Sequence, residues 1–218
     1  MKKEKIINLA KQAKEASFIL ADLNTSFKNS ALKKIAEGLL KRSGYIINKN
    51  LLDIKNAKAK NLSSSVIDRL LLDHLRIKSM SDSVSNIARL CDPVGGIEHL
   101  TKRPNGLLIG KMRVPIGVIA IIYESRPNVT SDCVALCLKS GNSVILRGGS
   151  DAVESNKAIY DVILDALNQT NIPKEAVNLI KDTSREKVKE LLGLKEYIDL
   201  VIPRGGEGLI KAVTNTST

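Results

Sequence analysis

Residues 115–150 contain two short apolar runs separated by one helical pattern, and no other part of the chain constrains the fold as strongly. The run 116–123 is almost wholly aliphatic and β-branched, which is typical of a strand buried on both faces. Residues 129–139 have helical spacing, Gly141 ends that helix, and residues 143–146 form a second buried strand. The stretch therefore predicts one β-α-β unit. The helix is expected to turn one face inward, consisting of Val129, Cys133, Leu136 and Cys137.

The same alternation of strands and helices continues after residue 150. The pattern predicts a helix at 152–168, a strand at 177–180, a helix at 185–192, a strand at 197–202 and a helix from Leu209 onward. Four strands that alternate with four helices at these lengths predict an α/β fold with a Rossmann-like parallel sheet and right-handed crossovers. Ligands of such sheets bind at the carboxyl edge of the strands.

Residues 1–91 are predicted to be entirely helical and to carry no chemistry. The first two helices, the second at 25–42, are expected to bury one stripe each, formed by Ile6, Ile7, Ala10, Ala13 and Ala16, and by Leu32, Ile35, Ala36, Leu39 and Leu40. Gly44 weakens the pattern before a third helix at 46–59. Ser64 or Ser65 is expected to cap a helix at 66–72, and Asp82 or Ser83 to begin the last helix, which runs through Leu90.

Residues 92–96 (Asp-Pro-Val-Gly-Gly) break the helical pattern, and two β-capable runs follow at 97–103 and 107–114. The Pro-Asn-Gly sequence between these runs predicts a β-hairpin. The hairpin segment 106–112 superficially looks like a phosphate-binding loop. It has one residue too few between its glycines and Met112 in place of Ser or Thr, so we reject that interpretation.

Composition limits the classes of partner. No apolar run reaches the roughly 18 residues that a membrane span needs, and the polar start is unlike a signal peptide, so we expect a cytoplasmic protein without a membrane partner. The net charge of +11 would suit nucleic acid. However, lysine and arginine alternate with acidic residues, and the 3% aromatic content offers no stacking platform. We therefore expect no nucleic-acid partner, and a basic surface that attracts phosphorylated small molecules.

Three polar turns are expected to meet at the carboxyl edge of the sheet, at 147–150, 182–185 and 204–206. Glycines allow close backbone approach, helix N-termini attract anions, and an arginine can hold a phosphate through two hydrogen bonds. Together the turns predict a dinucleotide or another phosphorylated ligand. The alternative is that each Gly-Gly pair only makes a tight strand-to-helix turn. No Gly-x-Gly-x-x-Gly follows the first strand, so the common dinucleotide fingerprint is absent.

No catalytic residue can be assigned from the sequence. There is no serine with a histidine partner, no metal cluster and no cysteine predicted in an exposed turn. Cys133 and Cys137 are expected in the core, and Cys91 at the end of a helix beside Asp92. The residues alone therefore predict a phosphate-ligand-binding α/β domain.

Six motifs extend this interpretation. They stand at 92–95, 115–119, 122–129, 138–142, 145–149 and 199–206. In this order they resemble the γ-glutamyl phosphate reductases (glutamate-5-semialdehyde dehydrogenases) of the aldehyde dehydrogenase superfamily. The resemblance implies NADPH-dependent reduction of L-glutamyl 5-phosphate to L-glutamate 5-semialdehyde in proline biosynthesis. It also implies a homo-oligomer and a partnership with the glutamate 5-kinase that supplies the substrate.

The resemblance also assigns residues. Arg147 would suit the 2′-phosphate of NADPH, and Arg126 and Asn128 would contact the substrate. The cofactor-binding residues that it implies are Tyr123, Glu124, Ser125, Arg147, Gly148, Gly149, Ser150, Asp182, Thr183, Arg204, Gly205 and Gly206.

The family's domain plan divides the chain into a helical part of the cofactor domain at 1–96, an oligomerisation-arm hairpin at 97–114 and an NADP-binding α/β part at 115–218. In the family the thiol nucleophile lies further along, in a catalytic domain that these residues do not include. We therefore expect the amino-terminal half of such an enzyme, inactive by itself. The alternative is a truncated, non-catalytic nucleotide-binding module.

Overall fold

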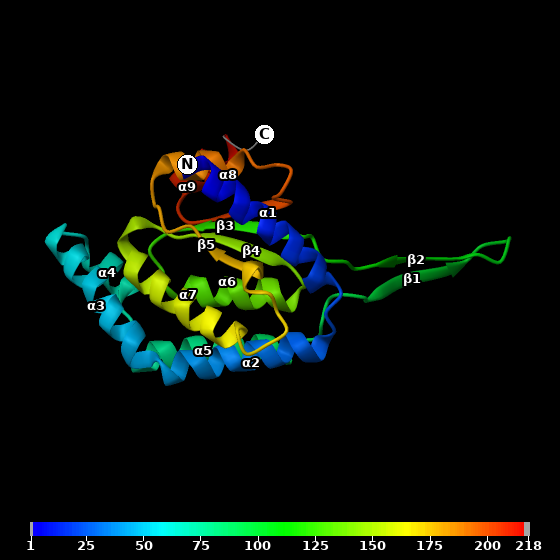
Figure 1. Cartoon of the computed structure of the whole chain (residues 1–218), viewed down its shortest axis with the longest axis horizontal. Helices are drawn as coiled ribbons and strands as arrows, with labels where there is room; N and C mark the ends of the chain where they lie inside the picture. Colours follow the sequence, from blue (N-terminus) through cyan, green and yellow to red (C-terminus); the bar gives the residue numbers. More distant parts are fainter. Residues whose placement is uncertain (1, 216–218) are drawn as a thin grey trace.

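A four-stranded parallel sheet lies at the centre of the molecule (Figure 1). The computed structural model describes residues 2–215. The strand order is β5-β4-β3-β6, so that β3 and β4 are the inner strands. The strands are β3 (Val118–Tyr123), β4 (Ser143–Arg147), β5 (Val177–Leu179) and β6 (Leu200–Arg204). This confirms the predicted α/β fold with a parallel sheet.

Helices cover both faces of the sheet (Figure 1). One face carries α1 (Lys2–Ala21), α8 (Arg185–Leu192) and α9 (Glu207–Thr214). The other carries α6 (Asn128–Lys139) and α7 (Val153–Leu167), with α2 (Thr25–Lys41) and α5 (His74–Arg89) packed outside them. At one end of these layers stand α3 (Ser43–Ala59) and α4 (Ser64–Leu70). Two short 3₁₀ turns, η1 (Ser150–Ala152) and η2 (Lys174–Ala176), precede α7 and β5.

The unbroken apolar run of β3 is explained by two cores, one on each face of the sheet. All six residues of this strand are buried. Ile119, Ile121 and Tyr123 join the core beneath α6 and α7. Val118, Ala120 and Ile122 join the core beneath α1, α8 and α9. Successive side chains of a strand point to opposite faces, so a strand covered on both sides loses the polar alternation of a surface strand.

The predicted hairpin is confirmed. β1 (Ile97–Lys102) and β2 (Leu108–Met112) pair antiparallel and project away from the body of the molecule (Figure 1). Gly106 has a φ of +84°, a left-handed conformation that glycine adopts without strain. Every residue of both strands is exposed, apolar ones included. The structure thus leaves the hairpin without a packing partner among the described residues.

The N-terminal helix boundaries differ from those predicted. The last helix of this region begins at His74 rather than near Asp82, because the Asp73 side chain caps it by accepting the Arg76 backbone N–H at 2.7 Å. Residues 71–73 are not helical, so the predicted helix at 66–72 was too long at its end. Helix α3 begins at Ser43, which places Gly44 inside it. The prediction underrated aspartate as a helix start within an otherwise continuous helical pattern.

Three further predictions from pattern were wrong. Leu40 is 46% exposed and Leu136 is 51% exposed, although both were expected to face inward. In both helices the buried face is narrower than the set of apolar residues in the sequence. The last strand begins at Leu200 rather than at residue 197, because the backbone N–H groups of Tyr197 and Ile198 donate to the Leu194 carbonyl in a turn. It extends through Pro203, which is tolerated because β6 is an edge strand of this sheet.

Asp199 joins three elements where β6 begins. One carboxylate oxygen accepts the Val118 backbone N–H at 2.8 Å, and both oxygens lie 2.7 Å from the Lys14 ammonium of α1. Gly117 has a φ of +122°, and a Cβ there would lie 2.2 Å from Asp199 Oδ2. The first residue of the motif at 199–206 therefore has a structural role.

Replacing Asp199 with alanine is expected to lower the free energy of unfolding by about 2 kcal/mol, because a charge-assisted hydrogen bond and an ion pair are lost together. Urea denaturation measures the change. Glu207→Ala is the matched control, since the Glu207–Lys211 pair is 79% and 70% exposed and links only neighbouring turns of α9. Equal losses in the two variants would show that Asp199 does not fasten α1 to the sheet.

Candidate cofactor site

A cleft of about 830 Å³ lies at the carboxyl edge of the sheet. Its walls come from the turns that follow β3, β4 and β6, from the segment after β5, and from α4 at its side. The turns at 147–150, 182–185 and 204–206, which were predicted to meet at one edge, are therefore brought together in space. Parallel strands all end at the same edge, so their following turns converge there.

Most residues predicted to bind the cofactor or substrate line this cleft: Tyr123, Glu124, Ser125, Arg126, Arg147, Gly149, Ser150, Thr183, Arg204, Gly205 and Gly206. Three do not. A Cβ on Gly148 would lie 2.2 Å from Asn156 Nδ2, so this glycine permits packing beneath the turn. Asp182 is exposed and accepts the Ser184 N–H at 2.9 Å. Asn128 lines a neighbouring pocket instead.

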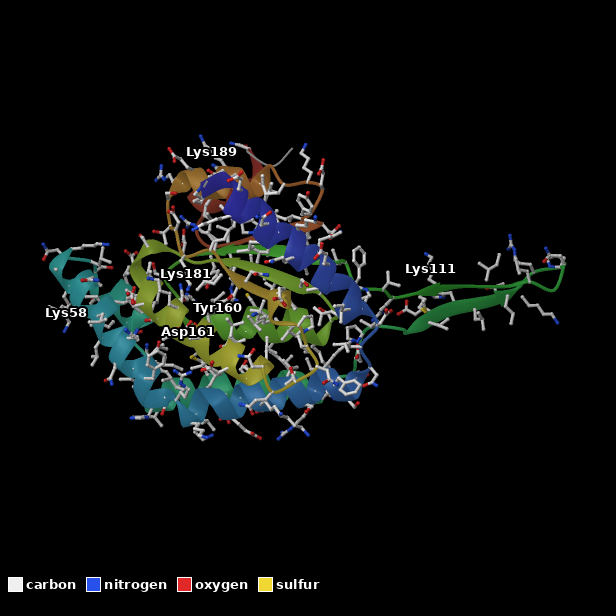
Figure 2. The ribbon with its side chains drawn as sticks, viewed as in Figure 1. Lys58, Lys111, Tyr160, Asp161, Lys181 and Lys189 are labelled. Carbon is white, nitrogen blue, oxygen red and sulfur yellow. The ribbon has the colours of Figure 1, made fainter. Side chains whose placement is uncertain are left out.

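Arginine dominates the charge of the cleft. Two acidic residues, Glu124 and Asp151, line it beside five guanidinium groups, those of Arg69, Arg126, Arg147, Arg185 and Arg204. Lysines are spread over the rest of the surface: Figure 2 labels Lys58, Lys111, Lys181 and Lys189, which are exposed and come from four separate segments. The cleft therefore concentrates the residue type that holds phosphate oxygens in pairs of hydrogen bonds.

Arg147 has spare hydrogen-bonding capacity at this edge. Its Nη2 donates to the Thr183 carbonyl and so joins two of the turns. Its Nε is buried and has no hydrogen-bond partner among residues 2–215. Burial lowers the pKa of the guanidinium, and the charge of Asp182 opposes that shift. A buried N–H without an acceptor is costly, so this group fits an oxygen of an anionic ligand.

The Tyr123 phenol belongs to the core. Its hydroxyl lies 2.7 Å from Thr130 Oγ1, which in turn donates to Asn156 Oδ1 at 3.0 Å. The side chain is 1% exposed, and burial raises its pKa well above the ordinary value. Contact between a cofactor and this phenol would require the hydrogen-bonded network to break.

The Glu124 side chain, which follows β3, contacts the turn at 204–206. Its Oε2 accepts the Gly206 backbone N–H, at 3.1 Å, at the N-terminus of α9. A Cβ on Gly205 would lie 2.6 Å from Glu124 Cδ, so the glycine permits this close approach. A helix N-terminus favours an anion, and here a carboxylate takes the position that the sequence predicted for a phosphate.

A buried carboxylate from α3 supports the turn at 147–150. Asp53 is 3% exposed and accepts the Ser155 N–H at 2.7 Å, the Ser155 hydroxyl at 2.6 Å and the Glu154 N–H at 3.2 Å, capping α7. Burial raises the pKa of Asp53, and the bonds from Ser155 oppose that shift. The cap fixes the helix that follows residues 147–150. No local sequence pattern predicts this cap, because Asp53 is separated from Glu154 and Ser155 by 101 and 102 positions in the sequence.

The N-terminal helices also reach the cleft. Leu62, Val66 and Arg69 line it, although this region was predicted to carry no chemistry. Nothing in the sequence around Arg69 marks it, since it is one basic residue on a short amphipathic helix. Its position depends on the packing of α3 and α4 beside α7 and η1.

None of the three cysteines lines the cleft. Burial raises the pKa of the Cys133 thiol, against the effect of the nearby Arg204, and raises that of Cys137 to about 12. Cys91 is exposed outside any helix, which corrects the expectation that no cysteine would stand in an exposed turn. Within residues 2–215 no group of histidine, cysteine and acidic side chains is arranged to hold a metal. In the same range, no helix has the length and apolar content of a membrane span.

Curated relatives match the chain over its whole length. The gamma-glutamyl phosphate reductase of Clostridium perfringens (strain SM101) is 50% identical over 218 residues, which is 100% of this chain and 52% of that protein. The gamma-glutamyl phosphate reductase of Caldanaerobacter subterraneus subsp. tengcongensis is 54% identical over 209 residues, covering 96% of this chain and 50% of that protein. The chain thus spans about half the length of these relatives.

Solved structures and a family model agree with these matches. The gamma-glutamyl phosphate reductase of Thermotoga maritima superposes with a TM-score of 0.95 at 46% identity, over 97% of this chain and 51% of that one. An acetylating aldehyde dehydrogenase from Geobacillus thermoglucosidasius, with a TM-score of 0.79 at 17% identity over 99% of this chain and 45% of that one, shares the fold. The model of the aldehyde dehydrogenase family matches residues 1–218. The chain belongs to the aldehyde dehydrogenase family.

Proposed function

We propose that the chain binds NADPH in the arginine-lined cleft and forms the cofactor-binding part of a γ-glutamyl phosphate reductase. The observation that carries the proposal is the convergence of three helix-starting turns and five arginines in one cleft. The gamma-glutamyl phosphate reductases that are 50% and 54% identical to this chain support the choice of reaction. That reaction is the reduction of L-glutamyl 5-phosphate to L-glutamate 5-semialdehyde. When bound, the nicotinamide supplies the hydride for that reduction.

Different residues of the cleft bind different parts of the dinucleotide. Arg147 and Ser150 receive the ribose 2′-phosphate, for which the partnerless Arg147 Nε is the main support. The N–H groups at Gly205 and Gly206 receive the pyrophosphate after Glu124 moves away. Ser125 and Arg126, in the turn after β3, face the nicotinamide and the acyl phosphate.

Residues 97–114 form the arm through which copies of the protein associate. The support is a hairpin whose apolar side chains all lie in solvent: Ile97, Leu100, Leu107, Leu108, Ile109 and Met112. A projecting apolar hairpin is stabilised when another chain covers it. In this division residues 1–96 and 115–218 make up the cofactor domain, and the supplying glutamate 5-kinase is a further candidate partner.

Titration of the purified chain with NADPH tests the proposal. We expect saturable binding, followed by nicotinamide fluorescence, that is at least about tenfold tighter for NADPH than for NADH, because an added charge-assisted pair forms. Glu124→Gln is expected to tighten NADPH binding about two- to fivefold by removing the competing carboxylate. A chain that binds neither nucleotide would overturn the proposal.

A further inference from the structure

A second pocket, of about 250 Å³, lies beside the main cleft between α5 and the start of α6. Arg69 lines both hollows, so they adjoin at this side chain. The second pocket also contains Asn128 and Asp132 of α6 and Ser83 of α5. It therefore lies next to the turn that follows β3.

Asp132 presents a carboxylate that is held in place without being neutralised. The Ser83 hydroxyl donates to Oδ1 at 3.0 Å and the Asn128 amide donates to Oδ2 at 3.2 Å. Both donors are neutral, and Asp132 forms no ion pair with any residue that the structure describes. Asn128, predicted to touch the substrate, here orients this carboxylate.

The two arginines of the pocket differ in their partners. Arg76 pairs with Asp68 at 2.6 Å and donates to the Leu71 carbonyl at 3.0 Å, so its guanidinium is occupied in joining α4 to α5. The Arg69 side chain has neither an ion pair nor a hydrogen bond within residues 2–215. The pocket thus offers one uncompensated carboxylate and one uncompensated guanidinium.

We propose that this pocket binds the α-amino-acid head of the substrate. The Asp132 carboxylate accepts the α-ammonium group, and Arg69 pairs with the α-carboxylate, while the acyl phosphate extends into the main cleft. This rests on the proposed function, which supplies a zwitterionic substrate. Asp132 is half-buried and Arg69 is exposed. Opposite charges on separate helices favour a ligand that carries both complementary charges, because a molecule that lacks either one forms one ion pair fewer.

Three small molecules test the pocket on the full chain. L-Glutamate has both α-substituents, glutarate lacks the ammonium group, and 4-aminobutyrate lacks the α-carboxylate; all keep the distal carboxylate. We expect L-glutamate to bind about tenfold more tightly than either analogue, measured by NMR titration. Asp132→Asn should abolish the preference over glutarate and keep that over 4-aminobutyrate. Arg69→Gln should do the reverse.

Matched controls separate recognition from folding. Asp161→Asn alters another half-buried helical aspartate, which accepts the Tyr45 hydroxyl at 3.2 Å and lies on α7 (Figure 2). Arg89→Gln alters an exposed arginine on α5. Both controls should keep both preferences.

Two results would overturn the inference: absence of L-glutamate binding, or unchanged preferences in Asp132→Asn and Arg69→Gln. NADPH titration of the same samples reports on the proposed function separately. Loss of NADPH binding with intact amino-acid preferences would contradict that function and leave the amino-acid pocket standing.

Discussion

Arg147→Glu is expected to weaken NADPH binding at least about 100-fold and NADH binding less than about threefold, because it exchanges a charge-assisted pair for repulsion of the 2′-phosphate. The guanidinium stands at the end of β4, and its buried Nε has no hydrogen-bond partner in the part of the chain that the structure describes. A carboxylate there would face the phosphate inside a partly desolvated cleft. Fluorescence titration of both nucleotides measures the ratio directly.

The same substitution also removes the hydrogen bond from Arg147 to the Thr183 carbonyl. Arg147→Met removes that bond and the positive charge without adding a negative one, and should cost NADPH about tenfold. Arg89→Glu, on the outer helix α5, applies the same charge change outside the cleft and should alter neither affinity. If NADPH and NADH lose affinity equally in both Arg147 variants, Arg147 only holds the turns together.

Sequence periodicity located the sheet because β3 and β4 are buried on both faces, which leaves an apolar pattern that few other structures produce. Two of the turns were also predictable, since a Gly-Gly pair directly after a strand is typical of a tight strand-to-helix turn. Their meeting in one cleft followed from the shared direction of parallel strands.

The rest of the cleft depends on contacts between distant residues. Asp53 caps a helix that begins a hundred positions later, and Glu124 reaches the Gly206 N–H across 82 positions. Arg69 enters the cleft because α4 packs at the end of the layers, which its own sequence does not indicate. Helix starts were misplaced for a related reason: the cap at Asp73 competes with a continuous apolar pattern, and only its hydrogen bond to Arg76 decides the outcome.

The 218-residue chain by itself is expected to show no reductase turnover. The proposed reduction requires a thiolate that displaces phosphate from the acyl phosphate to give a thioester, which then accepts hydride and releases the aldehyde and the thiolate. Of the described thiols, Cys133 and Cys137 are buried with raised pKa values, so they stay protonated. Cys91 is exposed, but it is not among the residues that line the cleft.

The assay is semialdehyde-dependent reduction of NADP in phosphate, the reverse direction, because an acyl phosphate hydrolyses readily. We expect no turnover above a protein-free blank in a sample whose NADPH titration shows that the cleft is folded. Turnover that disappears in Cys133→Ser but survives in Cys137→Ser would contradict this and identify Cys133, beside Arg204, as the nucleophile. Both cysteines lie on the same buried face of α6, so the two substitutions perturb packing alike and differ in proximity to that guanidinium. A difference between them would therefore report chemistry rather than stability.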